Sequence, residues 1–202
     1  MDTKLLYQGH GSLRVTASDG TVIYLDPYAG KGYDKPADLI LITHQHDDHT
    51  QVDLITNKKP GCRIITNAEA LAGGKHNSFS IGNIKIESVE AGNKNHDPKQ
   101  CVGFIVTVDK IKLYFCGDTS KTKSMETFAQ KKIDYAFLPC DGIYNMDMEE
   151  AAECARLIGA RFNIPIHMKP GELFDAKRAD TFKAPNRLIV PAGEEIILKA
   201  AE

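Results

Sequence analysis

Three histidines and an aspartate occur within six residues of this chain, at His44, His46, Asp48 and His49. The preceding residues 38–43 are apolar, β-rich and non-alternating, as expected for a strand that is covered on both faces. In the segment after such a strand, His44 and His46 point the same way, whereas Asp48 and His49 turn toward a neighbouring position. No structural need explains this density of imidazoles, so the motif predicts one loop that contributes to two metal sites.

Size and charge narrow the class of protein. The chain has 202 residues, 42% of them hydrophobic, and a net charge of -2. These values predict a single domain over residues 1–202, with no overall positive field to attract nucleic acid or an anionic membrane. We find neither a signal-type apolar segment at the N-terminus nor a run of eighteen apolar residues, which favours a cytoplasmic protein with no membrane partner. Homo-oligomer formation is left open.

The five cysteines are odd in number and never spaced C-x-x-C, so we expect mostly reduced, buried thiols.

The remaining pattern predicts an α/β fold in two strand-rich halves, with the histidines at strand ends. The expected strands cover residues 4–8, 12–17, 21–25, 38–43, 62–66, 83–89, 102–108, 111–116, 161–167, 187–190 and 194–198. The expected helices cover residues 51–58, 67–72 and 147–158, of which the last has an apolar stripe and ends at a glycine.

Three downstream segments extend the pattern. They are Asn95-His96-Asp97-Pro98 before a strand, Gly117-Asp118-Thr119 after a strand, and Ile164-Pro165-Ile166-His167 late in the chain. Together with His44-Gln45-His46-Asp47-Asp48-His49 they resemble the ligand motifs of the metallo-β-lactamase superfamily, over nearly the whole chain. The resemblance implies a four-layer αββα sandwich and is strongest to the compact branch related to ascorbate-6-phosphate lactonases.

The resemblance also implies a ligand set for two divalent metal ions. The first ion would be bound by His44, His46 and His96, and the second by Asp48, His49 and His167, with Asp118 and a hydroxide bridging them. Without the cluster around His44, a lone histidine such as His96 would be assigned to the core or the surface. Imidazole and carboxylate ligands suit zinc, which we prefer, but also manganese, iron or nickel. Asp48 and Asp118 are the expected catalytic residues.

The implied function is a metal-dependent hydrolase that uses the bridging hydroxide on a small-molecule ester, lactone or phosphodiester. One alternative is a phosphodiesterase or nuclease-type hydrolase, which would need cationic contacts such as Lys169 or Arg14. Another alternative is a metal-binding module without catalysis. The fold and the metal ligands alone do not distinguish between these functions.

Several other residues have two interpretations. Asp26 is either an acceptor for a ligand imidazole or a turn residue, and Tyr144 either touches the substrate or packs at the rim. We expect Cys116 to be buried packing rather than a thiolate ligand. His10 and His76 match no ligand motif and are assigned to the structure or the surface, with His10 a candidate for the rim of the site.

Overall fold

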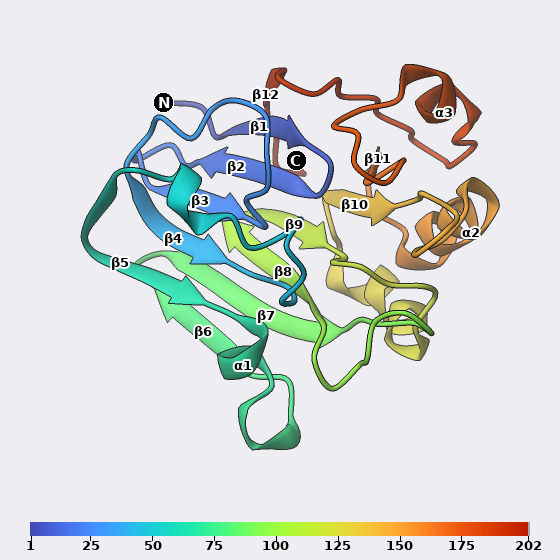
Figure 1. The fold of residues 1–202 in the computed structure, drawn as a ribbon, viewed down its shortest axis with the longest axis horizontal. Helices are drawn as coiled ribbons and strands as arrows, with labels where there is room; N and C mark the ends of the chain where they lie inside the picture. The colour runs from blue at the N-terminus through green and yellow to red at the C-terminus, as the bar shows by residue number, and fades with distance from the viewer. Residues whose placement is uncertain (202) are drawn as a thin grey trace.

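Two six-stranded sheets pack face to face in the computed structural model, which describes residues 1–201 (Figure 1). The first sheet has the order β12-β1-β2-β3-β4-β5. Its strands are β1 (Lys4–Gly9), β2 (Ser12–Thr16), β3 (Val22–Leu25), β4 (Ala37–Leu41), β5 (Lys58–Ile65) and β12 (Glu195–Ile197). The second sheet has the order β11-β10-β9-β8-β7-β6. Its strands are β6 (Ser78–Ile81), β7 (Ile84–Glu90), β8 (Val102–Val108), β9 (Ile111–Phe115), β10 (Tyr135–Pro139) and β11 (Phe162–Ile166).

Each sheet is part antiparallel and part parallel, and the parallel part positions the site. Strand β3 runs parallel to β4, and β4 to β5, in the first sheet. Strands β9, β10 and β11 are parallel in the second sheet. The carboxyl ends of parallel strands meet at one edge of a sheet, where α/β proteins bind ligands. The segments that follow β3, β4, β9, β10 and β11 are therefore brought to such edges.

The main core fills the space between the two sheets. Alternate residues of each strand point into it, such as Leu5 and Tyr7 in β1 and Phe104 and Val106 in β8, and all four are fully buried. Two-residue periodicity puts one face of each strand in this layer. The opposite faces form separate apolar layers with the helices and loops outside the sheets.

The outer face of the second sheet is covered by α2 (Met148–Ile158) and the 3-10 helix η3 (Lys123–Lys131). Helix α2 packs beside β10 (Figure 1). Its first turn is capped by the Asp147 side chain, and Gly159 ends it with a φ of 65°. The outer face of the first sheet carries a thinner layer that includes Tyr33 and the 3-10 helix η1 (Val52–Leu54). The expected αββα layering is confirmed.

The remaining helices are short. They are α1 (Asn67–Ala70), the 3-10 helix η2 (Ala72–Gly74) and α3 (Ala176–Thr181). The last of these was not predicted from the sequence. Among residues 1–201, no helix combines the length and apolar character needed to span a bilayer.

Two predicted elements are wrong. The helix expected over 51–58 is only the single turn η1, because the chain from Lys58 onward pairs with β4 as an edge strand. The strand expected over 187–190 is reduced to one bridge between Arg187 and Asn163. Pro185 and Pro191 flank this segment and have no backbone N–H to donate, so neither residue can extend the bridge into a ladder.

A candidate metal centre at the strand ends

The candidate ligands lie in loops that leave the parallel strands. The loop after β4 carries the histidine-rich motif, Asp118 follows β9, and His167 follows β11 directly. Asp26 and Asp141 occupy the corresponding places after β3 and β10. Contacts between these loops join the two sheets at this end of the molecule, so distant stretches of sequence converge on one place.

The first group consists of His44, His46 and His96. Their ligand atoms lie within 4.8 Å of one another, and His44 Nε2 is 3.1 Å from His46 Nδ1. His44 and His96 are buried, whereas His46 is exposed. Three imidazole nitrogens at this spacing form one face of a tetrahedral zinc site.

Hydrogen bonds fix which nitrogen of each buried ring points inward. Thr43 Oγ1 donates to Asp26 Oδ2 at 2.6 Å, so it accepts from His44 Nδ1 at 3.0 Å. Asn93 Oδ1 likewise accepts from His96 Nδ1 at 3.0 Å. Both rings therefore keep the lone pair on Nε2, which faces the group. Burial is the main cause that lowers the pKa of His44 to about 2, which keeps this ring neutral and able to bind a metal.

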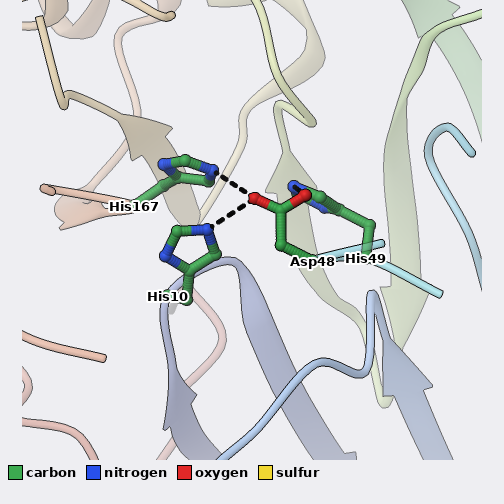
Figure 2. A group of neighbouring side chains, drawn as sticks. All are labelled: His10, Asp48, His49 and His167. Atoms are coloured by element: carbon green, nitrogen blue, oxygen red, sulfur yellow. Dashed lines mark hydrogen bonds and ion pairs between the residues drawn. The ribbon is translucent and has the colours of Figure 1, made fainter. Parts of the chain in front are cut away.

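The second group contains Asp48, His49 and His167, together with His10 (Figure 2). His49 Nδ1 lies 2.9 Å from Asp26 Oδ2, and His167 Nδ1 lies 3.1 Å from Asp141 Oδ2. These outer carboxylates turn both Nε2 atoms inward.

Asp118 lies between the two groups. One carboxylate oxygen is 3.4 Å from His49 Nε2, and the other is 3.2 Å from His96 Nε2 and 3.4 Å from His167 Nε2. Asn145 Nδ2 donates to the same carboxylate at 3.0 Å. A carboxylate that meets imidazoles of both groups is placed to bridge two cations.

Gly117 allows this placement of Asp118. Its φ of 65° is a left-handed conformation, and a Cβ there would lie 2.6 Å from the carbonyl oxygen of Val102. Only glycine meets both conditions. Three non-glycine residues of the centre, His10, Asp26 and His167, also have left-handed backbone, with φ of 56°, 43° and 45°. Such conformations concentrate at functional sites because the surrounding structure must impose them.

Charge in the centre is strongly coupled. Burial alone would raise the pKa of Asp118, but His167 and His49 hold it well below its usual range. Burial alone would lower the pKa of His167, but Asp118, Asp141 and Asp48 raise it to about 10. Burial alone would likewise lower the pKa of His49, but Asp118 and Asp26 outweigh it and raise that pKa. In the metal-free protein, His49 and His167 thus belong to a network of imidazolium and carboxylate groups, whereas His44 is neutral.

A pH dependence follows from the pKa of His167. Because it exceeds the ordinary value of 6.5, protonated His167 stabilises the metal-free fold fully below pH 6.5, and this contribution is lost as the pH rises through about 10. A metal ligand must be neutral, so metal binding displaces this proton. Because at least the proton of His167 is released, we expect metal affinity to rise by at least about tenfold per pH unit between pH 7 and pH 9. Competition against a chelator of known pH dependence measures this slope, and an affinity that stays flat over that range would contradict it.

All seven residues predicted as ligands come together in this cluster. Of the ambiguous residues, Asp26 contacts His49 and Thr43 as an acceptor, and Cys116 is buried in the apolar layer under α2. Lys169 is exposed and pairs with Glu172, while Arg14 is buried and pairs with Asp34 and Glu195. His76 is exposed, as expected.

Sequence reasoning missed two residues of the centre, His10 and Asp141. His10 is fully buried and contacts Asp48, rather than lying at the rim. Its signal was the pair of flanking glycines in Gly9-His10-Gly11, which allow a tight turn against other groups. Asp141 comes two residues after a fully buried strand, a place that resembles that of Asp118.

A cavity of about 420 Å³ opens onto the centre. It is lined by His46, Asp48, Asn95, His96, Asp118, Tyr144 and His167. Tyr144 is 51% exposed at this opening. Its backbone is held on both sides, since Asp141 Oδ1 accepts from its N–H and the side chains of Asn93 and Asn95 donate to its carbonyl. The ring is therefore presented to the cavity by a well-anchored loop.

A family model described as the β-lactamase superfamily domain matches residues 4–167. The chain belongs to the metallo-β-lactamase superfamily. Within this superfamily, it is 30% identical to a UPF0173 metal-dependent hydrolase from Pyrococcus furiosus, over 98% of this chain and 97% of that protein.

Two solved structures agree with this chain in fold. A proposed metal-dependent hydrolase from Parabacteroides distasonis has a TM-score of 0.75 and 30% identity, over 94% of this chain and 92% of that one. A metallo hydrolase from Ignicoccus hospitalis has a TM-score of 0.79 over the whole of both chains, and at 21% identity it shows likeness of fold alone.

Proposed function

We propose that this metal-dependent hydrolase binds two divalent metal ions, preferably zinc, and cleaves a small uncharged ester or lactone. The observation that carries the proposal is the convergence of six inward-facing side chains around Asp118, beneath a cavity whose described lining has no lysine or arginine. His44, His46 and His96 would hold one ion. Asp48, His49 and His167 would hold the other, with Asp118 shared.

Two buried atoms test the fit of a metal to this centre. His49 Nε2 and His167 Nε2 are shielded from solvent, and each faces a carboxylate oxygen of Asp118 at 3.4 Å without forming a well-aligned hydrogen bond to a described residue. Buried polar atoms are nearly always satisfied, so two ring nitrogens that face one carboxylate without a well-formed hydrogen bond fit a shared divalent cation. Bound there, divalent ions supply Lewis acidity, which polarises a substrate carbonyl and lowers the pKa of a water molecule toward neutrality.

Asp48 lies where it can act on the attacking water. Its side chain is 35% exposed and lines the cavity. Burial alone would raise its pKa, but its hydrogen bond with His10 and its ion-pair contact with His167 hold it well below its usual range. Asp48 therefore remains a carboxylate at neutral pH and can accept a hydrogen bond from water beside the substrate.

The lining of the cavity favours an uncharged substrate over a phosphodiester. Phosphate recognition usually recruits arginine or lysine, in addition to any metal. Lys169 and Arg14 are the two residues that the sequence suggested as possible phosphate contacts. Both pair with carboxylates outside the lining of the cavity. The residues that line the cavity instead include the amide of Asn95 and the aromatic ring of Tyr144, which suit a neutral ester or lactone.

A substrate panel tests the proposal. The zinc-loaded protein is assayed on a series of lactones and aryl esters and on bis-nitrophenyl phosphate, with metal content measured on the same sample. We expect a higher kcat/KM on at least one lactone or ester than on the phosphodiester. A preference for the phosphodiester would contradict the proposed substrate class. Full metal occupancy with no turnover on any substrate would instead favour a non-catalytic metal-binding module.

Tyr144 gives a prediction about substrate binding. Replacing it with alanine removes an aromatic surface worth about 1.5 to 3 kcal/mol when fully covered, so we expect kcat/KM to fall by about 10- to 100-fold. The loss should reside mainly in KM, because the ring touches bound substrate rather than the reacting atoms. Tyr144→Phe should retain most activity, and Leu54→Ala, which removes another exposed apolar side chain, is the control. An unchanged KM in Tyr144→Ala would exclude this contact.

A further inference from the structure

His10 lies in the tight turn between β1 and β2 and is fully buried. Its backbone N–H donates to Leu173 O at 2.7 Å, and its carbonyl accepts from the backbone N–H of His167 at 2.9 Å. The hydroxyl of Tyr7 donates to the same carbonyl. These bonds connect the turn to the segment after β11, which carries the candidate ligand His167. The backbone of His10 is therefore held in place, and so is the position from which its imidazole extends.

Both ring nitrogens of His10 have partners. Nδ1 is 3.2 Å from the carbonyl oxygen of Glu172, and because a carbonyl only accepts, Nδ1 is the donor. Nε2 is 3.0 Å from Asp48 Oδ2 (Figure 2), and because a carboxylate oxygen also only accepts, Nε2 donates as well. The other oxygen of Asp48, Oδ1, faces His49 Nε2 at 3.8 Å. His167 Nε2 lies 3.6 Å from Oδ2 as well, so the Asp48 carboxylate is held by His10 while both of its oxygens face candidate ligand imidazoles.

The turn that carries His10 fits closely against the second group. The rings of His10 and His167 have centroids 3.7 Å apart. A Cβ on the neighbouring Gly11 would lie only 3.0 Å from His49 Cε1, so the close approach needs glycine there. Asp48, by contrast, is 35% exposed and follows a loop whose preceding residues are exposed. His10 and His167 are the side chains that hydrogen-bond or ion-pair with Asp48 Oδ2.

We propose that His10 is a positioning residue of the second metal site. Its Nε2 holds Asp48 Oδ2 and so orients the carboxylate toward His49 and His167, while its Nδ1 anchors the ring to Glu172. This inference rests on the proposed function, in which Asp48, His49 and His167 bind a metal ion. Residues that hydrogen-bond to a metal ligand without touching the metal typically contribute about 10- to 100-fold in metal affinity.

Two substitutions distinguish the contributions of the two ring nitrogens. In His10→Asn the amide nitrogen takes the place of Nδ1, so the contact with Glu172 is kept and the contact with Asp48 is lost. In His10→Gln the amide nitrogen takes the place of Nε2 and still reaches Asp48. The φ of 56° at this position suits asparagine better than glutamine, so backbone strain acts against the expected order of the two variants.

Cobalt(II) alone is the probe, added to chelator-stripped protein and followed by its visible spectrum and by competition with a chelator. We expect wild type to bind two equivalents. His10→Asn should bind the second about 10- to 100-fold more weakly, with an altered spectrum. His10→Gln should stay within about threefold of wild type and keep its spectrum, because it retains the donor to Asp48. His76→Asn, at the exposed non-ligand histidine, should behave as wild type.

Two other results would overturn the inference. If wild type binds two equivalents and His10→Asn does the same with unchanged affinity, His10 does not position the site although the proposed function stands. If His10→Gln is as impaired as His10→Asn, the imidazole itself is needed, as a ligand would be. A wild-type protein that fails to bind a second cobalt ion would overturn the inference and the proposed two-metal function together.

Discussion

Asp118→Asn is expected to abolish turnover and to weaken binding of both metal ions. The side chain is 3% exposed, and its oxygens lie within 3.4 Å of imidazole nitrogens from both groups. Asparagine keeps the shape but removes the charge and one acceptor. Metal ions contribute several kcal/mol to stabilisation of the transition state, so kcat/KM should fall by about a thousandfold or more. Steady-state kinetics and metal content of the purified variant measure the two effects.

Asp47→Asn is the matched control. This aspartate lies in the same histidine-rich loop but is exposed, and it belongs to neither group of candidate ligands. We expect wild-type metal content and kcat/KM within about twofold, because exposed substitutions away from a site have small effects. Equal losses in the two variants would mean that general disturbance of charge, rather than a bridging carboxylate, explains the result.

Asp26→Asn should weaken both the fold and the metal site. Asp26 is buried and accepts three contacts, from the backbone and hydroxyl of Thr43 at 2.8 and 2.6 Å and from His49 Nδ1 at 2.9 Å. An amide turns its NH2 toward at least one of these donors. We expect the free energy of unfolding to fall by about 1 to 3 kcal/mol and metal affinity to fall by about 10- to 100-fold.

The backbone itself is not expected to contribute to this loss, since asparagine tolerates the φ of 43° at this position. Denaturant unfolding of the metal-free protein and cobalt titration give the two numbers separately. Asp19→Asn is the control, because Asp19 is an exposed turn aspartate that accepts from Thr21 N–H at 2.9 Å. An Asp26→Asn protein as stable as wild type, with unchanged metal affinity, would show that Asp26 is only a turn residue.

The sequence predicted those parts of the centre whose geometry is set by residues that are neighbours in the sequence. The alternation of His44 and His46 after a buried strand placed their nitrogens 3.1 Å apart, as the side-chain period of an extended segment requires. Helix α2 was predicted for the same reason, since its stripe, its Asp147 cap and Gly159 are all local signals. His96, Asp118 and His167 are isolated in the sequence. Their convergence could be expected only from the resemblance, because it depends on how the two sheets pack.

What the sequence could not predict depends on contacts between distant segments. His10 precedes Asp48 by 38 residues and its other partner, Glu172, follows by 162. Asp141 acts on His167 from the neighbouring strand end, and its other oxygen organises the loop that carries Tyr144. The glycines beside His10 and the strand end before Asp141 are only weak local signals, so the contacts of both residues appear only once the turns, strands and loops are assembled.

The central claim is that these seven side chains bind two adjacent metal ions, and anomalous diffraction from crystals of the zinc-loaded protein tests it most directly. Data collected on either side of the zinc absorption edge should show two peaks. One should lie among His44, His46 and His96, and the other among Asp48, His49 and His167, with Asp118 in contact with both. No peak at this centre, or a single peak at full loading, would contradict the account.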